Sequence, residues 1–193
     1  MSRKAAFIDR DGVLNEERAF VHRIEEFAFV PGAIEALRML KDAGYLLVVV
    51  TNQSGIARGL YSEADYLALT GHMRERLEAA GVSLDGVEYC PHLPDAPVVQ
   101  YRLECDCRKP KPGMLRRAIQ ALDIDPGMSL LVGDRLSDVE AGRAAGIGRC
   151  FLVRTGYPLP DEAISRADAV YGDLLACVKR VLCAGSAPRG QNR

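Results

Sequence analysis

The sequence predicts an α/β protein with a Rossmann-like, mostly parallel sheet that carries helices on both faces. Short apolar runs alternate along the chain with segments of helical periodicity, and this alternation is typical of parallel βαβ units. Residues 45–51 are apolar up to the final threonine, as expected of a strand buried on both faces. A length of 193 residues suffices for one domain with a substantial core, so we expect a single domain over residues 1–193.

The first half of the chain contains clear signals for strands and helices. Pro31 and Gly32 are typical of a helix start, and Gly44 ends the apolar period that follows. Ser62 begins a capping signal, after which apolar residues recur at helical spacing. The expected elements are, in order, a strand at 5–8, an irregular loop at 15–30, a helix at 31–43, a strand at 45–51, a turn at 52–55, a helix at 62–80 and a short strand at 87–90.

The second half begins with a long loop at residues 90–112, which is rich in proline and cysteine and has no period. Pro112 in a first turn predicts the next helix. The remaining elements are expected to be a helix at 112–122, a strand at 129–134, a helix at 137–145, a strand at 150–153 and a helix at 173–183. The composition of residues 185–193 predicts a disordered tail.

The bulk composition argues against several classes of function. Hydrophobic residues make up 48% and charged residues 26%, as in a soluble globular protein. The net charge of −1 argues against binding to nucleic acid or to a membrane, and no apolar run is long enough to span a bilayer. The first strand begins within five residues of Met1, which leaves no room for a signal peptide, so we expect a cytoplasmic protein. No long heptad pattern indicates assembly, so we expect a monomer.

Two carboxylates follow the first predicted strand. Asp9 stands at the end of the apolar run, Asp11 comes two residues later, and Gly12 allows the chain to turn. Side chains at positions i and i+2 of an extended segment point to the same side. Two like charges at that distance need a cation or a shared proton. A single acid after a strand is often no more than a polar turn, but the pair predicts a functional site.

Polar residues also follow two other predicted strands, and the carboxyl ends of parallel strands meet at one edge of a sheet. The six residues at these strand ends are Asp9 and Asp11, Thr51 and Asn52, and Asp134 and Asp138. Proteins usually bind Mg²⁺ with one or two carboxylates, and water and phosphate oxygens complete the coordination sphere of the ion. The basic segment at residues 108–111 adds the positive charge that a phosphate needs. The combination favours phosphoryl transfer over glycoside or peptide hydrolysis.

Four segments resemble, in order, the motifs of phosphatases of the haloacid dehalogenase superfamily. They are residues 7–15 (FIDRDGVLN), 49–55 (VVTNQSG), 109–113 (KPKPG) and 132–138 (VGDRLSD), and the resemblance covers residues 5 to about 153. It implies that Asp9 attacks phosphorus and forms an aspartyl-phosphate. Asp11 would then give a proton to the leaving alkoxide and later take one from water. Mg²⁺ would be held by Asp9, the backbone carbonyl of Asp11 and Asp134.

The same resemblance gives roles to three further residues. Thr51 and Lys109 would hold the phosphoryl oxygens, by a hydrogen bond and by charge respectively. Asp138 would not bind the Mg²⁺ directly but would orient Lys109 or a metal-bound water. The alternative is that Asp138 faces solvent on the first turn of its helix.

The proline-rich loop contains a second candidate metal site. Its four candidate ligands form two closely spaced pairs, Cys90 with His92 and Cys105 with Cys107. Three thiols and an imidazole make a full tetrahedral set for Zn²⁺, which leaves no coordination position for a substrate and indicates a structural ion. The alternative is a loop with unrelated reduced cysteines. The zinc loop at 90–107 would hold Arg108 and Lys109 in place. The other three cysteines, Cys150, Cys177 and Cys183, are expected in the core.

The cysteine pairs also narrow the resemblance to two groups of phosphatases. Heptose-bisphosphate phosphatases and histidinol-phosphate phosphatases both place C-x-H and C-x-C before R-K-P. The twelve residues between His92 and Cys105 favour the heptose group, because the histidinol group has a shorter stretch there. The chain also lacks the dehydratase domain that is often fused to the histidinol enzyme.

Substrate contacts are predicted from the same resemblance. The loop at 15–30 is too short for a cap domain, so the site should be open and the substrate should be selected by loops. Arg108 would bind a distal phosphate through its forked donors. The expected substrate-binding residues are Glu17, Arg18, Ala19, Phe20, Asn52, Gln53, Ser54, Arg108 and Arg135. Residues 17–20 differ from the Asp-His-Gly-Tyr-like stretch of the relatives, which leaves Glu17 as the specific expectation there.

The sequence therefore predicts a Mg²⁺-dependent, zinc-containing phosphoric monoester hydrolase. The resemblance implies that its substrate is a small sugar bisphosphate: it would remove the C7 phosphate of a heptose 1,7-bisphosphate on the route to nucleotide-activated heptose for lipopolysaccharide. The preferred anomer is left open. The alternatives are a histidinol-phosphate phosphatase, a nucleic-acid 3′-phosphatase, which the net charge disfavours, and a non-catalytic zinc module, which would not need the acids and lysine.

Overall fold

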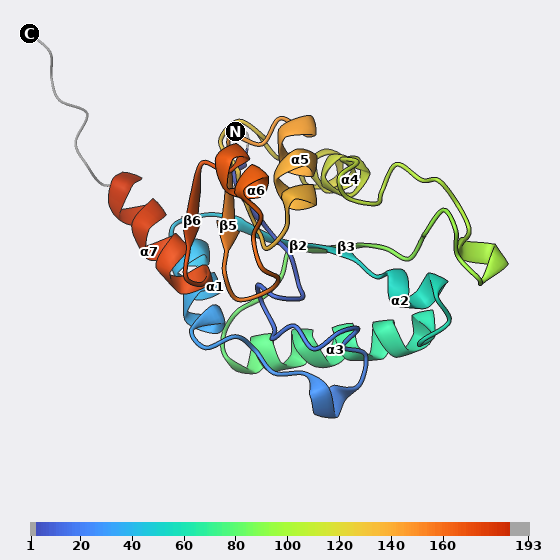
Figure 1. The fold of residues 1–193 in the computed structure, drawn as a ribbon. Helices are drawn as coiled ribbons and strands as arrows, with labels where there is room; N and C mark the ends of the chain where they lie inside the picture. Colours follow the sequence, from blue (N-terminus) through green and yellow to red (C-terminus); the bar gives the residue numbers. More distant parts are fainter. Residues whose placement is uncertain (1–2, 186–193) are drawn as a thin grey trace, which may run out of the picture.

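The computed structural model describes residues 3–185, which form a six-stranded sheet in the order β3-β2-β1-β4-β5-β6 (Figure 1). All five strand pairings are parallel, so the predicted fold class is confirmed. The strands are β1 (Ala5–Ile8), β2 (Leu46–Asn52), β3 (Gly86–Cys90), β4 (Leu130–Gly133), β5 (Arg149–Val153) and β6 (Ala169–Tyr171).

Helices cover both faces of this sheet, as predicted. One face packs against α1 (Ala33–Asp42), α3 (Glu63–Ala79) and α7 (Leu174–Gly185), and the other against α4 (Gly113–Leu122), α5 (Leu136–Ala144) and α6 (Asp161–Arg166). Side chains of β1 alternate between the two cores: Ala6 and Ile8 enter one, and Ala5 and Phe7 the other. Burial on both faces explains why the central strands are apolar without a period of two.

The structure adds short elements that the sequence did not predict. The predicted turn at 52–55 is in part a helical turn, α2 (Ser54–Ala57), and the segment after β5 contains α6 and the edge strand β6. Both irregular loops contain one turn of 3-10 helix, at Ile24–Glu26 and Val99–Tyr101. Segments of three to six residues are too short to show a hydrophobic period, so the sequence carries no signal for them.

The end of the chain differs from the prediction in two respects. Helix α7 continues to Gly185, beyond the predicted end at residue 183, and the rest of the predicted tail, residues 186–193, lies outside the described part. Cys150 and Cys177 are core residues as predicted, but Cys183 is exposed, so that part of the prediction is wrong. Val181, two residues earlier, is buried in the core, so the helix still packs there and Cys183 lies on its outer side.

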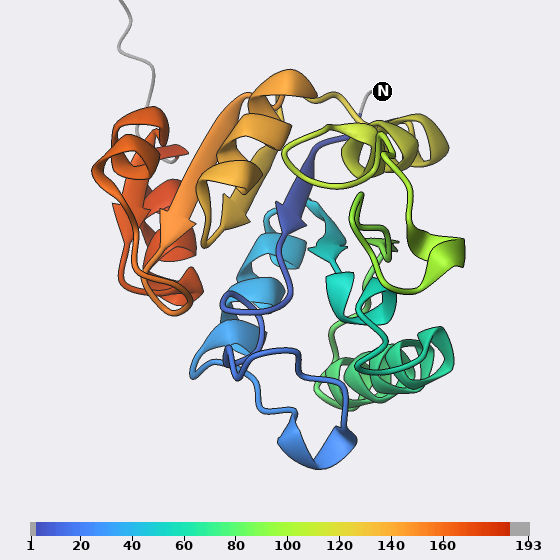
Figure 2. The ribbon, with the colours of Figure 1, turned by 45° about the vertical axis from the view of Figure 1, so that its right-hand side comes forward.

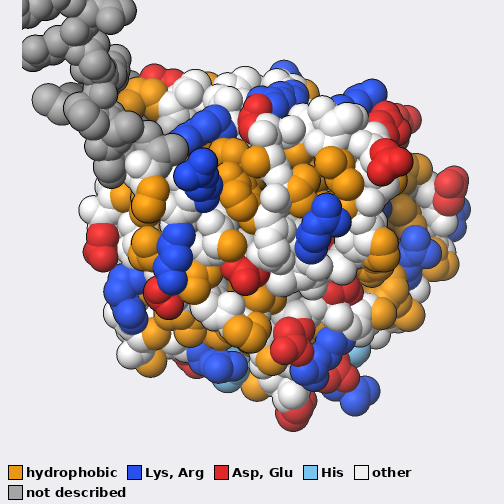
Figure 3. Space-filling model, turned by 60° about the vertical axis from the view of Figure 1, so that its left-hand side comes forward, with side chains coloured by type: hydrophobic (Ala, Val, Ile, Leu, Met, Phe, Trp, Pro, Cys, Tyr) orange, Lys and Arg blue, Asp and Glu red, His pale blue; other side chains and the backbone are white. Residues whose placement is uncertain are grey.

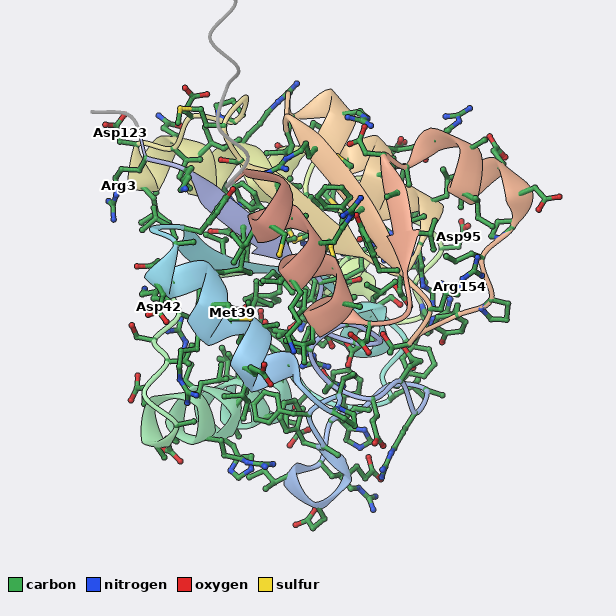
Figure 4. All side chains as sticks on the ribbon, turned by 90° about the vertical axis from the view of Figure 1, so that its left-hand side faces the viewer. Arg3, Met39, Asp42, Asp95, Asp123 and Arg154 are labelled. Carbon is green, nitrogen blue, oxygen red and sulfur yellow. The ribbon has the colours of Figure 1, made fainter. Side chains whose placement is uncertain are left out.

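The molecular surface is mixed in charge and polarity. On the face shown in Figure 3, basic and acidic side chains are interspersed among scattered apolar ones. In Figure 4, Arg3 and Asp123 lie at one corner of the molecule, where the Arg3 N–H donates to the Asp123 carbonyl at 3.3 Å, and Asp95 and Arg154 lie on the opposite side. Among residues 3–185, no helix is long and apolar enough to cross a bilayer.

The sheet order places the predicted site at the middle of one edge. β1 lies between β2 and β4, and Ile8 pairs in register with Val49 on one side and Val132 on the other. The residues that follow these three strands therefore emerge beside one another. Figure 2 shows β1 in the centre of the sheet, with the loop at 15–30 running on from its carboxyl end.

Candidate active site

Asp9 lies directly after β1 and is almost enclosed, with 8% of its surface exposed. Its Oδ1 accepts a hydrogen bond from the backbone N–H of Arg10 at 2.7 Å, and its Oδ2 lies 3.0 Å from the Lys109 ammonium. Burial raises the pKa of Asp9 well above its ordinary value, and the charges of Asp138 and Asp134 raise it further, while Lys109 opposes this. Additional positive charge beside Asp9 would therefore favour its carboxylate form.

Lys109 connects the zinc loop to the nucleophile. Its Nζ is buried, lies 2.5 Å from Asp138 Oδ1 and donates to the Val50 carbonyl at 2.9 Å, so its three protons are directed at Asp9, Asp138 and Val50. Burial alone would lower the pKa of Lys109, but the two carboxylates raise it above its usual range, so the ammonium stays charged. The Asn52 side chain fixes the Lys109 backbone, donating to its carbonyl and accepting from its N–H, both at 3.1 Å.

Three acids form a cluster that suits a hard divalent cation. One carboxylate oxygen from each of Asp9, Asp134 and Asp138 lies within 4.8 Å of the others. Asp134 Oδ1 is buried and has no hydrogen-bond partner among the described residues; the nearest cation, Arg135, stands 4.0 Å away. A buried carboxylate oxygen without a donor is costly, and a metal ion would satisfy it. The residues therefore fit Mg²⁺, with Asp9 and Asp134 as ligands and Asp138 already bound to Lys109.

The acid cluster gives a prediction about the response to magnesium. Burial and the charge of Asp138 raise the pKa of Asp134 to about 6, so without metal this group favours folding at low pH, and that contribution is lost as the pH rises through 6. Mg²⁺ competes with the same proton. At a hundredfold excess over its Kd, Mg²⁺ should raise the Tm by about 5–10 °C at pH 7.5 and by less than half as much at pH 5.

Thermal unfolding with and without Mg²⁺ at the two pH values tests this prediction. Asp134→Asn is the control, because it removes the titrating ligand and should lose most of the response. An equal shift at pH 5 and pH 7.5 would contradict the assignment of the ion to this cluster.

Asp11 is not part of the acid cluster. Its side chain is 20% exposed, and its carboxylate accepts hydrogen bonds from Arg10, Asn15 and Gln53. The repulsion expected between two neighbouring acids is thus offset by separate cations of the protein itself: Lys109 beside Asp9, and Arg10 beside Asp11.

A cleft of about 600 Å³ opens above these residues. Most residues predicted to act on the substrate line it, namely Asp9, Asp11, Glu17, Phe20, Thr51, Asn52, Gln53, Ser54, Arg108, Lys109, Asp134 and Arg135. Arg18 and Ala19 do not: Arg18 pairs with Glu16 in solvent, and Ala19 occupies the left-handed backbone region at the loop tip. Asp138 does not line the cleft either, and it does not face solvent, because only 1% of it is exposed.

Several residues of the cleft have no signal in the sequence. Arg58, Tyr61, Pro110, Ser137 and Tyr157 line it without having been predicted. The Tyr157 N–H donates to Asp134 Oδ2 at 3.1 Å, and the guanidinium of Arg135 stacks 3.6 Å above the Tyr157 ring. Tyr157 lies in the loop after β5, and only the tertiary fold brings that loop to the acids.

The four predicted zinc ligands meet in space. Their ligand atoms lie within 4.8 Å of one another, with Sγ–Sγ distances of 3.2–3.5 Å and the Nδ1 of His92 at 3.3 Å from the Sγ of Cys107. These Sγ–Sγ distances exceed the length of a disulfide bond by more than 1 Å. Burial raises the pKa of the Cys90 and Cys107 thiols, so a bound cation is needed to hold them as thiolates. The donor set and its spacing fit one tetrahedral Zn²⁺.

The cysteine cluster is connected to the cleft at two points. Cys90 ends β3, whose neighbour β2 carries Thr51, and Cys107 immediately precedes Arg108. The Arg108 guanidinium also donates to the carbonyl of His92 at 3.3 Å. A shift of the cluster would therefore displace Arg108, and with it Lys109.

Loss of the cysteine cluster as a zinc site should lower activity without removing the catalytic groups. Cys107→Ala is expected to lose zinc and to lower kcat about 10- to 100-fold, because Lys109 keeps its anchor on Asn52 but loses the one on the loop. Metal analysis and steady-state kinetics measure the two effects. Cys183→Ala, which removes an exposed thiol, is the matched control and should change neither. A Cys107→Ala protein that is free of zinc and fully active would contradict this role.

Known proteins resemble this chain along nearly its whole length. Residues 106–177 match the family model described as HAD-hydrolase-like. The D-glycero-beta-D-manno-heptose-1,7-bisphosphate 7-phosphatase of Pasteurella multocida is 51% identical over 168 residues, 87% of this chain and 91% of that one. The protein of the same name from Haemophilus ducreyi is 49% identical over 182 residues, 94% and 100% of the two chains. A solved D,D-heptose 1,7-bisphosphate phosphatase of B. bronchiseptica, complexed with magnesium and phosphate, is 35% identical with a TM-score of 0.80 and covers 94% and 99%.

Proposed function

The chain belongs to the heptose-1,7-bisphosphate 7-phosphatases of the HAD-like hydrolases, and we propose that it hydrolyses the C7 phosphate of D-glycero-D-manno-heptose 1,7-bisphosphate. The products would be heptose 1-phosphate and inorganic phosphate. We further propose that it acts as a monomeric, single-domain, cytoplasmic enzyme on the route to nucleotide-activated heptose for lipopolysaccharide.

The proposed reaction has two steps. An oxygen of Asp9 bonds to the phosphorus of the C7 phosphate, and the bond from phosphorus to the C7 oxygen breaks. Asp11 gives its proton to that oxygen, so the sugar leaves as an alcohol. Water then attacks the phosphorus of the aspartyl-phosphate while Asp11 takes its proton, and phosphate departs with Asp9 restored.

The charge on the phosphoryl group must be balanced while it moves. When bound between Asp9 and Asp134, Mg²⁺ would supply positive charge that favours the ionised nucleophile and offsets the phosphate dianion. Lys109 and the Thr51 hydroxyl would hold the other phosphoryl oxygens. Asp138 would keep the Lys109 ammonium charged and directed at the site, since it forms the shortest contact of that ammonium.

The observation that carries the proposal is that buried Lys109 contacts both Asp9 and Asp138, two of the three clustered acids. Asp11, Thr51 and Arg108 line the cleft above them. The chain that holds this site is about half identical in sequence to heptose-bisphosphate phosphatases. Arg108 supports a bisphosphate substrate, because its contact to the His92 carbonyl uses Nη1 and leaves Nε and Nη2 for a distal phosphate. Structural Zn²⁺ at the cysteine cluster would fix Arg108 in that place.

The test measures Mg²⁺-dependent phosphate release from the α and β anomers of heptose 1,7-bisphosphate, from histidinol phosphate and from a 3′-phosphorylated oligonucleotide. One heptose bisphosphate should have a kcat/KM at least about a hundredfold above the last two substrates. Heptose 7-phosphate is the matched control, since it lacks only the distal phosphate. Equal or faster turnover of histidinol phosphate would contradict the proposed substrate, and no turnover at all would favour a non-catalytic zinc module.

A further inference from the structure

Arg10 follows the nucleophile directly, yet its side chain is among the most deeply buried in the protein. Only 1% of it is exposed, and it does not line the cleft. A buried guanidinium must be balanced by acceptors and negative charge. Its Nε donates to Asp11 Oδ2 at 3.1 Å and its Nη2 to Asp11 Oδ1 at 3.0 Å, so both oxygens of one carboxylate are held in a forked contact.

The other contacts of Arg10 fix the guanidinium itself. Its Nη2 also donates to the Val21 carbonyl at 3.0 Å and to Gln53 Oε1 at 3.3 Å, and its Cζ lies 5.6 Å from the centre of the Tyr66 ring. Val21 is a buried residue of the loop at 15–30, which carries Glu17 and Phe20 to the cleft. Arg10 thus joins three parts of the chain behind the cleft: the turn after β1, the substrate loop and the end of β2.

Two neutral donors complete the surroundings of Asp11. Asn15 Nδ2 donates to Oδ1 at 3.0 Å, and Gln53 Nε2 donates to Oδ2 at 2.9 Å. Gln53 is in turn fixed by the Tyr61 hydroxyl, which donates to its Oε1 at 2.6 Å. Gln53 was predicted to contact the sugar, but its amide is occupied within the protein, and it donates to Thr51 Oγ1 as well.

We propose that Arg10 is a positioning residue, which holds the Asp11 carboxyl group at the place where the leaving-group oxygen departs and links that place to the substrate loop through Val21. This rests on the proposed function, in which Asp11 is the general acid. Arg10 touches neither substrate nor metal in this proposal and acts only through Asp11.

The proposal has a consequence that a purely structural role lacks. A general acid matters in proportion to the basicity of the group that leaves. The C7 oxygen of a sugar leaves as a strongly basic alkoxide and needs the proton, whereas 4-nitrophenolate leaves without one. A displaced Asp11 should therefore slow the first step, formation of the aspartyl-phosphate, for the sugar phosphate and spare that step for 4-nitrophenyl phosphate. The second step needs Asp11 as the base for either substrate, so the two substrates have to be compared in the first step.

The test compares the rate of the first step for heptose 1,7-bisphosphate and 4-nitrophenyl phosphate in Arg10→Lys and Arg10→Gln, measured as leaving-group release in a single turnover with enzyme in excess. Lysine keeps the charge but cannot contact both oxygens, Val21 and Gln53 at once. We expect the rate of the first step to fall about 100-fold for the sugar and less than about threefold for the aryl ester, and the enzyme concentration that gives half the maximal rate with the sugar to change less than about threefold. The ratio of the two rates does not depend on the amount of folded enzyme, so it stays informative if the variants are unstable. Arg149→Lys, a half-buried arginine that donates to the Tyr45 hydroxyl, is the control.

Asp11→Asn separates this proposal from the one on which it rests. If Asp11→Asn slows the first step equally for both substrates, the general-acid role fails, and the role of Arg10 fails with it. If Asp11→Asn shows the leaving-group bias in the first step and the Arg10 variants slow that step equally for both substrates, only the role of Arg10 is overturned. If both are correct, Arg10→Lys adds no further bias in the Asp11→Asn background.

Discussion

Asp9→Asn is expected to abolish turnover of every phosphate monoester, with kcat lowered at least about 10⁴-fold. The amide keeps the size of the side chain but is a poor nucleophile toward phosphorus, and no neighbour can replace it. Asp134 and Asp138 are each engaged elsewhere, by the Tyr157 N–H and by Lys109. The effect should be the same for alkyl and aryl esters, since the first step needs the nucleophile whatever the leaving group.

Asp9→Asn should not unfold the protein, because an ionised Asp9 destabilises the metal-free fold. Burial and the nearby acids raise the pKa of Asp9 in the folded state, so the fold loses stability as the pH rises above the ordinary pKa of an aspartate. The neutral amide removes that penalty. Metal-free Asp9→Asn should therefore match or exceed the parent in Tm at pH 7.5, and its gain from Mg²⁺ should be smaller.

Phosphoenzyme trapping distinguishes the roles of the two motif acids. With radiolabelled 4-nitrophenyl phosphate, Asp11→Asn should still incorporate label because Asp9 is intact, and it should release the label slowly because water activation is lost. Asp9→Asn should incorporate none. Label on Asp9→Asn, or more than about 1% residual kcat, would contradict Asp9 as the nucleophile.

The predictions that rest on strand ends agree with the structure, because strand order determines where a chain emerges. Asp9 and Asp134 follow β1 and β4, and Thr51 is the second-last residue of β2. These three strands are neighbours at the centre of the sheet, so their apolar runs already indicated a common site. The zinc ligands could likewise be predicted from their spacing. Each pair has a single residue between its two ligands, which leaves few ways for the four side chains to form a tetrahedral set.

The sequence could not predict the site contacts that depend on the path of a loop or on the direction of a side chain. Gly12 turns the chain with a φ of +80°, and Arg10 is directed behind the cleft by contacts with Val21 and Gln53, which lie 11 and 43 residues away. An arginine between two acids would otherwise be taken for an exposed charge. Tyr157 reaches Asp134 by the same kind of long-range packing.

Lys109→Met should have the second largest effect, lowering kcat by about 10³-fold or more and destabilising the fold. The change removes the ammonium bound to Asp9 and Asp138, and breaking a buried ion pair from one side costs about 3–5 kcal/mol. Because Lys109 lowers the pKa of Asp9, its loss raises that pKa further. The deficit in unfolding free energy should therefore be largest at pH 7.5 and shrink as the pH falls and Asp9 takes up a proton.

Lys111→Met provides the matched control for this prediction. Lys111 stands two residues further along, pairs with the exposed Glu104 at 3.0 Å and does not line the cleft, so its loss should change kcat by less than about twofold and Tm by little. Denaturant unfolding at pH 5 and pH 7.5, with kinetics at saturating substrate, measures both variants. Equal losses in the two would mean that general positive charge of the loop, and not the buried ammonium of Lys109, supports turnover. A Lys109→Met protein whose stability deficit grew on acidification would contradict the ion pair with Asp9, because protonation should relieve an uncompensated carboxylate.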